Sequence, residues 1–270
     1  MIKVYGNGED IWNENGEMLL REPEKTGFFR GNAALLKKTD LNNYALRCEE
    51  DGHVLLALRL QPYSLLLYGD STLAEELAGF LCENSYDITA FMCEADLGDI
   101  FAEMLKKHSR ECRVNISMMF MECTEVCEPS SPEVAGAAAE DIDELTEDMN
   151  LFFADCGLPD RVTRESVANR LGNYRLIRLD GKIVSMASWS YMSEKIDRIT
   201  CVYTRPEYRG RGIARKVVNT LKNEILARGK TAALNVDTAN PVSSHLYASL
   251  GFKNSYLHRI YQVENGAETE

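Results

Sequence analysis

The stretch Val-Tyr-Thr-Arg-Pro-Glu-Tyr-Arg-Gly-Arg-Gly-Ile-Ala occupies residues 202–214 and overlaps a run of β-forming residues at 199–203. A glycine turn between a strand and a helix can bind a pyrophosphate, because successive backbone N–H groups and the positive end of the helix dipole point at the anion. Gly210 and Gly212 would let the backbone approach the phosphates closely, and the arginines beside them would add positive charge. The stretch therefore predicts an anion-binding turn that opens a helix.

Other glycine motifs fit this turn less well. A dinucleotide-binding fingerprint needs a third glycine or alanine where this chain has Arg215. A P-loop needs four residues between its glycines, followed by Lys-Ser or Lys-Thr, and that pattern is absent too. Taken alone, the turn could also be an ordinary arginine-rich surface loop, so the segments around it have to decide.

The segment after the turn predicts an amphipathic helix. Apolar residues recur at helical spacing, while polar residues occupy the other sides: Ala214, Val218, Leu221 and Ile225 against Lys216, Asn219, Lys222 and Arg228. Gly229 stands where the residue just past a helix C-terminus would lie. The helix is thus expected to begin at the turn and to end before Gly229.

A second strand and a second helix follow. Residues 231–237 alternate apolar and polar side chains, which predicts a strand. Asn240 can cap the next helix, Pro241 suits its first position, and Gly251 would end it.

Together these segments resemble the cofactor site of the GCN5-related N-acetyltransferases (the GNAT superfamily). The order Arg-x-x-Gly-x-Ala at 209–214 is similar to the acyl-CoA-binding signature of that family, and residues 234–252 resemble the second half of its site. The resemblance implies acetyl-CoA as the cofactor, with its pantetheine arm between two strands that splay apart. The cofactor-binding residues that it implies are Val202, Tyr203, Thr204, Arg209, Gly210, Arg211, Gly212, Ile213, Ala214, Arg215, Asn240, Ser243 and Tyr247.

The resemblance also implies roles in acetyl transfer. The main-chain N–H of Val202, or of a neighbour, would polarise the thioester carbonyl, and Tyr247 would protonate the departing thiolate. Tyr247 could instead be a core aromatic residue that packs against Leu250 or Phe252.

The general base stays open. Many members of the family carry a glutamate on the strand before the glycine turn, but residues 199–203 contain no carboxylate. Asp237 is our candidate and Asp197 is the alternative; either would act directly or through water. Three further side chains are better explained without a catalytic role. Glu207 is expected in a loop, Cys201 as a buried thiol and His245 as a surface imidazole.

The fold class expected from these features is α/β with a mixed sheet, the GNAT acyl-CoA N-acyltransferase fold, with a complete catalytic domain at 131–270. Its upstream elements would be an acidic helix from about 140, a helix capped by Thr163, and a hairpin of 174–179 with 182–189 around Asp180-Gly181.

The end of that domain has two expected parts. Residues 260–263 would form its last strand, and 264–270 would be a mobile polar tail.

The N-terminal part predicts a similar succession of elements. Strands are expected at 44–49, 53–60, 64–68, 88–93 and 113–123, and helices at 72–83, capped by Ser71, and at 97–108. This order repeats that of the C-terminal half, but Tyr-Gly-Asp-Ser at 68–71 replaces the glycine turn. We expect a degenerate GNAT-like domain at 1–128 without a cofactor motif, joined by a linker at 122–131. An unrelated α+β domain is the alternative.

Charge is distributed unevenly along the 270 residues, a length that suits two domains. The chain carries a net charge of −12, yet residues 161–263 hold 18 basic and 7 acidic residues, a net charge of +11. The basic excess lies where a polyanionic cofactor is expected, although part of it is ordinary helix surface. A chain this acidic overall is a poor candidate for binding nucleic acid.

The remaining composition predicts a cytoplasmic protein. No apolar run is long enough to span a membrane, and the N-terminus is not a signal peptide. The eight cysteines lack a Cys-x-x-Cys pair, which favours free thiols in a reducing compartment and no metal site.

The expected activity is therefore acetyl transfer from acetyl-CoA to the primary amine of a small molecule, an amino acid or a peptide, by direct attack in a ternary complex. A non-catalytic CoA-binding sensor or interaction protein is the alternative. An aminoacyl-tRNA-dependent transferase is less consistent, because it would need basic surface for RNA and no intact CoA turn. The acceptor and the oligomeric state stay open.

Overall fold

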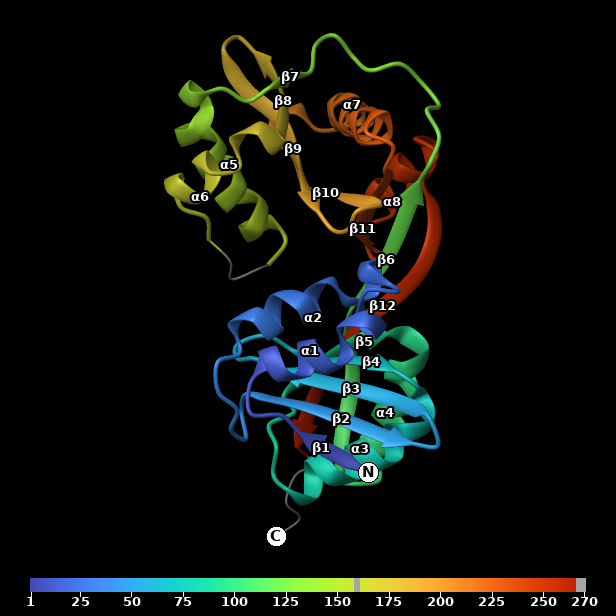
Figure 1. The fold of residues 1–270 in the computed structure, drawn as a ribbon. Helices are drawn as coiled ribbons and strands as arrows, with labels where there is room; N and C mark the ends of the chain where they lie inside the picture. Colours follow the sequence, from blue (N-terminus) through green and yellow to red (C-terminus); the bar gives the residue numbers. More distant parts are fainter. Residues whose placement is uncertain (158–160, 266–270) are drawn as a thin grey trace. The chain divides into compact units, whose positions relative to one another are not determined.

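The computed structural model describes residues 1–157 and 161–265, and the chain forms two compact units (Figure 1). Unit 1 comprises residues 1–119, 237–239 and 256–270, and unit 2 comprises residues 120–236 and 240–255. Two long strands, β6 (Arg110–Cys123) and β12 (Lys253–Asn265), contribute residues to both units. The division of the chain into domains at 1–128 and 131–270 stays a prediction.

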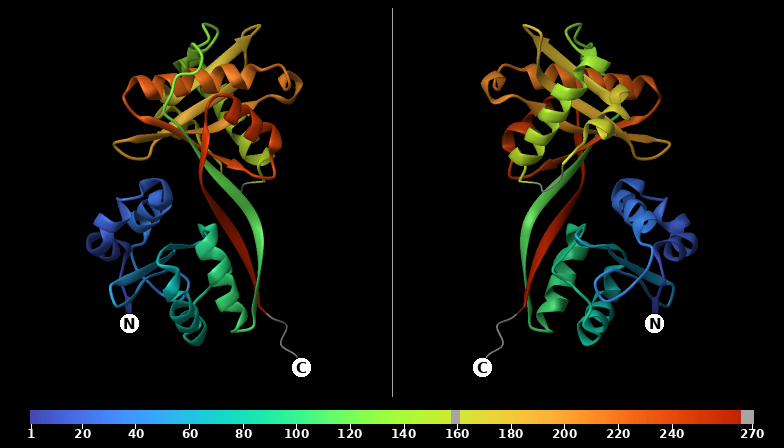
Figure 2. Two further views of the ribbon diagram at one scale, coloured as in Figure 1. Left: turned by 90° about the vertical axis from the view of Figure 1, so that its right-hand side faces the viewer. Right: turned by 90° about the vertical axis from the view of Figure 1, so that its left-hand side faces the viewer.

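Unit 1 is a mixed sheet with two helices on each face (Figures 1 and 2). Its strand order is β1-β2-β3-β4-β5-β12-β6. All pairs from β1 to β4, and β5 with β12, are antiparallel, whereas β4 and β5 are parallel. Besides β6 and β12 its elements are β1 (Ile2–Val4), α1 (Gly8–Leu19), α2 (Pro23–Leu35), β2 (Tyr44–Glu50), β3 (His53–Arg59), β4 (Leu65–Gly69), a short 3-10 turn (Ser71–Leu73), α3 (Ala74–Glu83), β5 (Ala90–Glu94) and α4 (Ala95–Lys106).

The strands of unit 1 are apolar on both faces because helices cover both. Along β2, Leu46 packs in the core under α3 and α4, while its neighbour Ala45 packs under α1 and α2. Two-sided burial explains the nearly continuous hydrophobic runs of β3 and β4.

Unit 2 repeats this order of elements. Its strands run β11-β10-β9-β8-β7 from the side of β6, with α5 and α6 on one face and α7 on the other (Figure 1). The strands β7 to β10 pair antiparallel, and β10 pairs parallel with β11. The elements are β7 (Ala135–Gly136), a 3-10 turn (Ala139–Asp141), α5 (Ile142–Asp155), α6 (Arg164–Ala168), a 3-10 turn (Leu171–Asn173), β8 (Tyr174–Leu179), β9 (Lys182–Tyr191), β10 (Ile196–Thr204), a 3-10 turn (Pro206–Tyr208), α7 (Ile213–Ala227), β11 (Thr231–Asp237) and α8 (Pro241–Ser249).

The expected α/β class with a mixed sheet is confirmed, and local signals act as predicted. Asp180 and Gly181 take positive φ in the two-residue turn between β8 and β9. Thr163 accepts a hydrogen bond from the Ser166 N–H and caps α6. Asn240 caps α8, with Pro241 in the first helical position.

Four local expectations are wrong. The first turn after β4 is capped by Asp70, which accepts from the Thr72 N–H, and not by Ser71. The last strand begins at Lys253, earlier than expected, and its residues 258–262 pair with β5. On α7, Asn219 and Lys222 are buried, because other segments cover the helix on that side.

Two contacts account for that burial. The Asn219 amide donates to the Pro129 carbonyl at 2.8 Å, and the Lys222 ammonium donates to the Leu250 carbonyl at 2.9 Å. Of the expected tail at 264–270, residues 266–270 lie outside the described part of the chain.

Helices α1 and α2 were not anticipated from the sequence. The Asn7 side chain caps α1 by accepting a hydrogen bond from the Asp10 N–H. The two helices bury Ile11, Leu19 and Phe29 against the sheet. They give unit 1 the same order of elements as unit 2, beginning with a short strand and two helices.

The C-terminal strand completes the core of unit 1. Tyr261 of β12 is buried and stacks on Phe91 of β5, with ring centroids 4.5 Å apart. The Tyr261 ring also lies so close to Gly98 of α4 that a Cβ at Gly98 would be 2.4 Å from it. Gly98 is therefore the residue that lets α4 approach β12.

We expect Gly98→Ala to lower the free energy of unfolding by about 1–3 kcal/mol, because the added methyl group overpacks this contact. Gly79→Ala in α3 is the matched control: its Cβ would meet nothing closer than 3.7 Å, so it should stabilise by about 0.5–1 kcal/mol through helix propensity. Thermal and urea unfolding of both variants measures this. Equal effects of the two substitutions would contradict the close packing of β12 on α4.

Candidate functional site

The site begins at an irregularity in β10. Its pairing with β9 shifts by one residue between Thr200 and Tyr203, and Cys201 has φ +53°. Cys201 and Val202 thus oppose a single residue of β9, which is a β-bulge. A bulge takes backbone groups out of the regular ladder and makes them available to a ligand.

The strands β10 and β11 part directly beside this bulge. Residues 196–198 of β10 pair with residues 231–233 of β11, and no other pair of described residues joins these two strands. The remaining halves of the two strands form the arms of a V. The predicted splay is therefore present, with its apex next to Arg198.

The glycine turn lies after the end of β10. Gly210 and Gly212 have φ +74° and +73°, and a Cβ at either would meet no atom within 4 Å. Gly212 is the N-cap of α7, and no side chain caps the first turn of that helix. The N–H groups of residues 213–215 are therefore available to an anion.

The arginines of the turn also have structural partners. The Arg209 guanidinium donates to the Thr204 carbonyl at 2.8 Å and to Asp155 at 2.6 Å. Arg211 donates to the Glu207 carbonyl at 2.9 Å. Arg215 binds Ser249 at the end of α8 and forms an ion pair of 3.1 Å with Glu128. These bonds hold the turn, and contact with phosphate stays a prediction for all three arginines.

On α8, Tyr247 is buried and Asn240 is exposed. The Asn240 side chain accepts from the Ser243 N–H at 3.0 Å. The Tyr247 ring packs edge-on against Phe252, with centroids 6.1 Å apart, so part of its role is in the core. Burial raises the pKa of Tyr247 to about 12. A hydrogen bond with Ser243 lowers the pKa but does not offset the effect of burial. The phenol therefore keeps its proton at neutral pH and can act as a donor.

Both candidate bases have other partners in the structure. Asp197 is buried and forms ion pairs of 3.0 Å with Arg228 and 2.9 Å with Lys230. Asp237 is exposed, groups with the residues of unit 1, and accepts from the Ala239 N–H at 2.9 Å.

Of the other side chains considered for the reaction, two lie at the surface as expected, whereas Cys201 is half-buried and not fully buried. Glu207 and His245 are exposed. Burial raises the pKa of the Cys201 thiol, which favours the neutral form and speaks against a nucleophile.

Three acids of α5, which were not expected from the sequence, form ion pairs with arginines at the end of β10 and in the turn. Arg205, just after β10, forms ion pairs of 2.8 Å with Glu144 and 3.0 Å with Asp148. Asp155 binds Arg209, as described above. The signal was available, since Glu144 and Asp148 lie one helical turn apart in a helix recognised as acidic.

Unit 1 lacks the bulge, the glycine turn and the tyrosine at the corresponding places, although its parallel strands β4 and β5 also pair over a short stretch only. The pairing of β3 with β4 shows no shift, and Asp70 stands in the turn after β4. Phe101 stands seven residues after the N-cap of α4, as Tyr247 does after the N-cap of α8. An acid in the turn would repel a pyrophosphate, and a phenylalanine has no proton to give.

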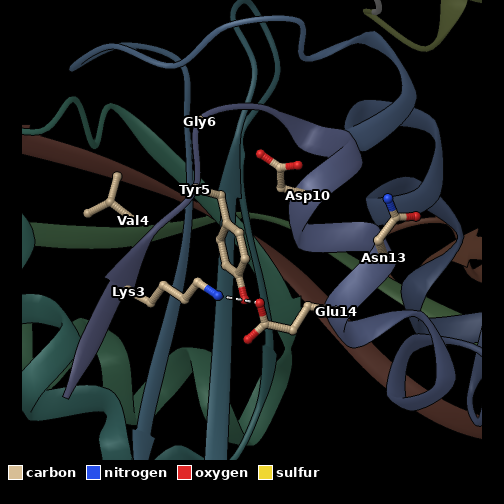
Figure 3. A pocket seen from close by; sticks show the side chains of 7 residues that line it. All are labelled: Lys3, Val4, Tyr5, Gly6, Asp10, Asn13 and Glu14. Atoms are coloured by element: carbon tan, nitrogen blue, oxygen red, sulfur yellow. Dashed lines mark hydrogen bonds and ion pairs between the residues drawn. The ribbon is translucent and has the colours of Figure 1, made fainter.

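Unit 1 has an open pocket of about 500 Å³ elsewhere, between β1 and α1 (Figure 3). The Lys3 ammonium lies 4.9 Å from the centroid of the Tyr5 ring and forms an ion pair with Glu14. Asp10 and Asn13 complete its polar lining. Two carboxylates and one paired cation make it unsuitable for a polyanion.

Comparison with known proteins agrees with this geometry. Residues 177–261 match the family described as FR47-like protein. An acetyltransferase of the GNAT family from Colwellia psychrerythraea has a TM-score of 0.68 at 14% identity, over 98% of this chain and 99% of that one. A GCN5-related N-acetyltransferase from Sphaerobacter thermophilus has a TM-score of 0.62 at 17% identity, over 83% and 82%.

A tandem GNAT protein from the clavulanic acid biosynthesis pathway covers 100% of both chains, with a TM-score of 0.58 at 10% identity. Comparison with curated protein sequences gives no match. The resemblance to GNAT proteins inferred from the motifs is confirmed at the level of the fold, and the tandem arrangement extends it to unit 1. In the described residues, no helix has the length and apolar character to cross a membrane.

The pairing of Asp148 predicts a pH-dependent difference in stability. Burial raises the pKa of Asp148 to about 6, so folding favours its protonated form. That contribution is present below the unfolded pKa of about 3.9 and is lost as the pH rises through 6. Between pH 4 and pH 7, we expect the free energy of unfolding of Asp148→Asn to improve by up to about 3 kcal/mol relative to the wild type.

Urea unfolding at several pH values measures that difference. Asp143→Asn is the control, because Asp143 is exposed and pairs with Arg164 at the surface. A difference for Asp148→Asn that does not change with pH would show that the Arg205 pair cancels the effect of burial, and a change in the opposite direction would show that the pair outweighs it.

Proposed function

We propose that residues 131–270 form an acetyl-CoA-dependent N-acyltransferase. The observation that carries the proposal is the V between β10 and β11, with a bulge at its apex and an uncapped glycine turn at its open end. Neighbouring folds described as GNAT acetyltransferases support the reaction class.

In this proposal the pyrophosphate of CoA binds the first N–H groups of α7. Residues 209–215 contribute the turn, in which Gly210 and Gly212 leave room for phosphate oxygens beside the backbone. The main chain of residues 202–204 binds the pantetheine arm along β10, and Asn240 and Ser243 contact it from α8.

The reaction is direct attack of an amine on the thioester. The amine nitrogen bonds to the acetyl carbon, the carbonyl oxygen becomes an oxyanion beside the Val202 N–H, and the C–S bond then breaks. Tyr247 donates its phenolic proton to the thiolate, and the proton lost by the amine restores the phenol through water. Asp237 stays the candidate base, acting through water because its carboxylate also holds a turn.

We infer a small amine, an amino acid or a peptide as acceptor, and a cytoplasmic location. The net charge of −12 argues against nucleic acid as a partner. The eight cysteines are free in the described structure, which suits a reducing compartment.

A CoA-binding protein without turnover is the second candidate. It is favoured by one observation: Asp197 is buried and forms ion pairs with Arg228 and Lys230. Binding with no transfer to any amine would support this second candidate.

Gly212→Asp should abolish binding of acetyl-CoA, because it places a negative charge at the proposed pyrophosphate site. Gly181→Asp is the matched control, since Gly181 has φ +77° and equally open space but lies in the hairpin between β8 and β9. We expect calorimetric titration to give micromolar binding for the wild type and Gly181→Asp, and at least 100-fold weaker binding for Gly212→Asp. Unchanged binding by Gly212→Asp would exclude the turn as the cofactor site.

Tyr247→Phe should reduce kcat about 100-fold and leave the affinity for acetyl-CoA within about threefold, because only proton donation is lost. Single-turnover release of CoA with an accepted amine measures the rate, and calorimetry measures the affinity. A wild-type rate in the variant would assign Tyr247 to the core alone.

A further inference from the structure

Two thiols of unit 2 lie where β6 passes into the segment that follows it. Cys123 is the last residue of β6 and is buried, whereas Cys127, four residues later, is exposed. Residues 124–134 form no helix or strand, so the backbone at Cys127 is not held in regular secondary structure. An accessible thiol thus lies four residues from one in the interior.

The two sulfur atoms converge on one point of the structure. A Cβ at Gly251, two residues after α8, would lie 2.5 Å from the Cys127 Sγ and 3.6 Å from the Cys123 Sγ. The two sulfurs can therefore be no farther apart than the sum of these distances, about 6 Å. Both thiols also donate to the Glu125 carbonyl, at 3.3 Å from Cys123 and 3.9 Å from Cys127.

A disulfide needs the sulfurs about 2 Å apart, so one side chain has to move. Cys127 can move because it is exposed and lies outside helices and strands, whereas Cys123 is held in β6. Loss of the Cys123 proton would not leave the Leu250 carbonyl, 3.9 Å from its sulfur, without a hydrogen bond. That carbonyl also accepts from the Lys222 ammonium at 2.9 Å. The buried thiol can therefore react without leaving this buried acceptor unsatisfied.

The pair directly precedes a segment that is bound to α7. The Glu128 carbonyl accepts from the Asn223 amide at 2.9 Å, and the Glu128 carboxylate forms an ion pair of 3.1 Å with Arg215. A covalent bond at Cys127 would restrict the chain one residue before these contacts. It would thus limit the movement of a segment that reaches the glycine turn.

We propose that Cys123 and Cys127 form a reversible disulfide when a peroxide oxidises the protein. This modification site is independent of the proposed acyltransferase activity. In a reducing compartment such a bond is transient, which is typical of thiols that respond to oxidants.

The accessible thiol reacts first. The Cys127 sulfur takes one oxygen atom from the peroxide, whose O–O bond breaks, and the products are a sulfenic acid and water or an alcohol. The Cys123 sulfur then attacks the Cys127 sulfur. The S–S bond forms, the S–O bond breaks, and the oxygen leaves as water with the proton from Cys123. The two thiols together lose two electrons, which the peroxide gains, and a dithiol reductant restores both thiols.

The test is peptide mapping of the full-length protein after treatment with hydrogen peroxide and alkylation of the remaining thiols. Cleavage after glutamate separates the two cysteines, because residues 122, 125 and 128 are all glutamates. We expect peptides 123–125 and 126–128 to be joined by a disulfide and to separate after treatment with dithiothreitol. Absence of the joined peptides, or a sulfinic acid at Cys127 beside a free Cys123 thiol, would overturn the inference.

A thiol shifted by one residue is the matched control. The double variant Val126→Cys, Cys127→Ser keeps a thiol in the same segment, at a position that is also exposed, but removes the sulfur that lies against Gly251. We expect it to form the intramolecular disulfide at least tenfold more slowly than the wild type. Equal rates would contradict the role of the position at Gly251.

Single serine variants complete the test. Cys127→Ser should give no joined peptides, whereas Cys156→Ser, at another exposed cysteine, should give as much as the wild type. Equal thermal unfolding temperatures of the reduced proteins would show that both variants are folded. A disulfide of Cys123 with Cys156 in place of Cys127 would overturn the inference.

Discussion

The parting of β10 from β11 is the constraint on which the candidate site depends. Parallel strands gain hydrogen bonds by pairing along their whole length, so a V must be held open by something else. The bulge at Cys201 changes the course of β10 at the point where pairing ends, and Arg205 anchors the end of the strand to Glu144 and Asp148 of α5. The glycine turn and α7 follow from that anchored end. The acids of α5 are therefore as much part of the site as the glycines.

The two units show how one order of elements can have or lack a cofactor site. Both pair four successive strands antiparallel and then a fifth strand parallel, and both carry helices on the two faces of the sheet. Unit 1 keeps a regular ladder, an acid in the turn and Phe101 on α4. Each difference removes one physical requirement: free backbone groups, a positive environment for phosphate, or a proton donor. The fold alone thus does not supply the activity.

Most of unit 2 could be predicted because its signals are local. Caps, turns and periodicity lie within a few residues of the element they define, as with Thr163, Asn240 and Asp180-Gly181. The errors concern contacts between segments far apart in the chain. The burial of Lys222 depends on Leu250, and the commitment of Asp197 depends on Lys230. Helix α2 has only weak apolar periodicity, whereas α1 has a clear apolar face and a cap at Asn7, so its signal was present in the sequence.

The closing strand of unit 1 has a consequence for the order in which the protein is made. Residues 90–94 pair with residues 258–262, so the sheet of unit 1 stays incomplete until residues 258–262 have left the ribosome. Until then β5 presents an unpaired edge and Phe91 lacks the ring of Tyr261 above it. N-terminal domains usually fold first during synthesis, but here the first unit must wait for the last strand. Biosynthesis thus couples the folding of the two units.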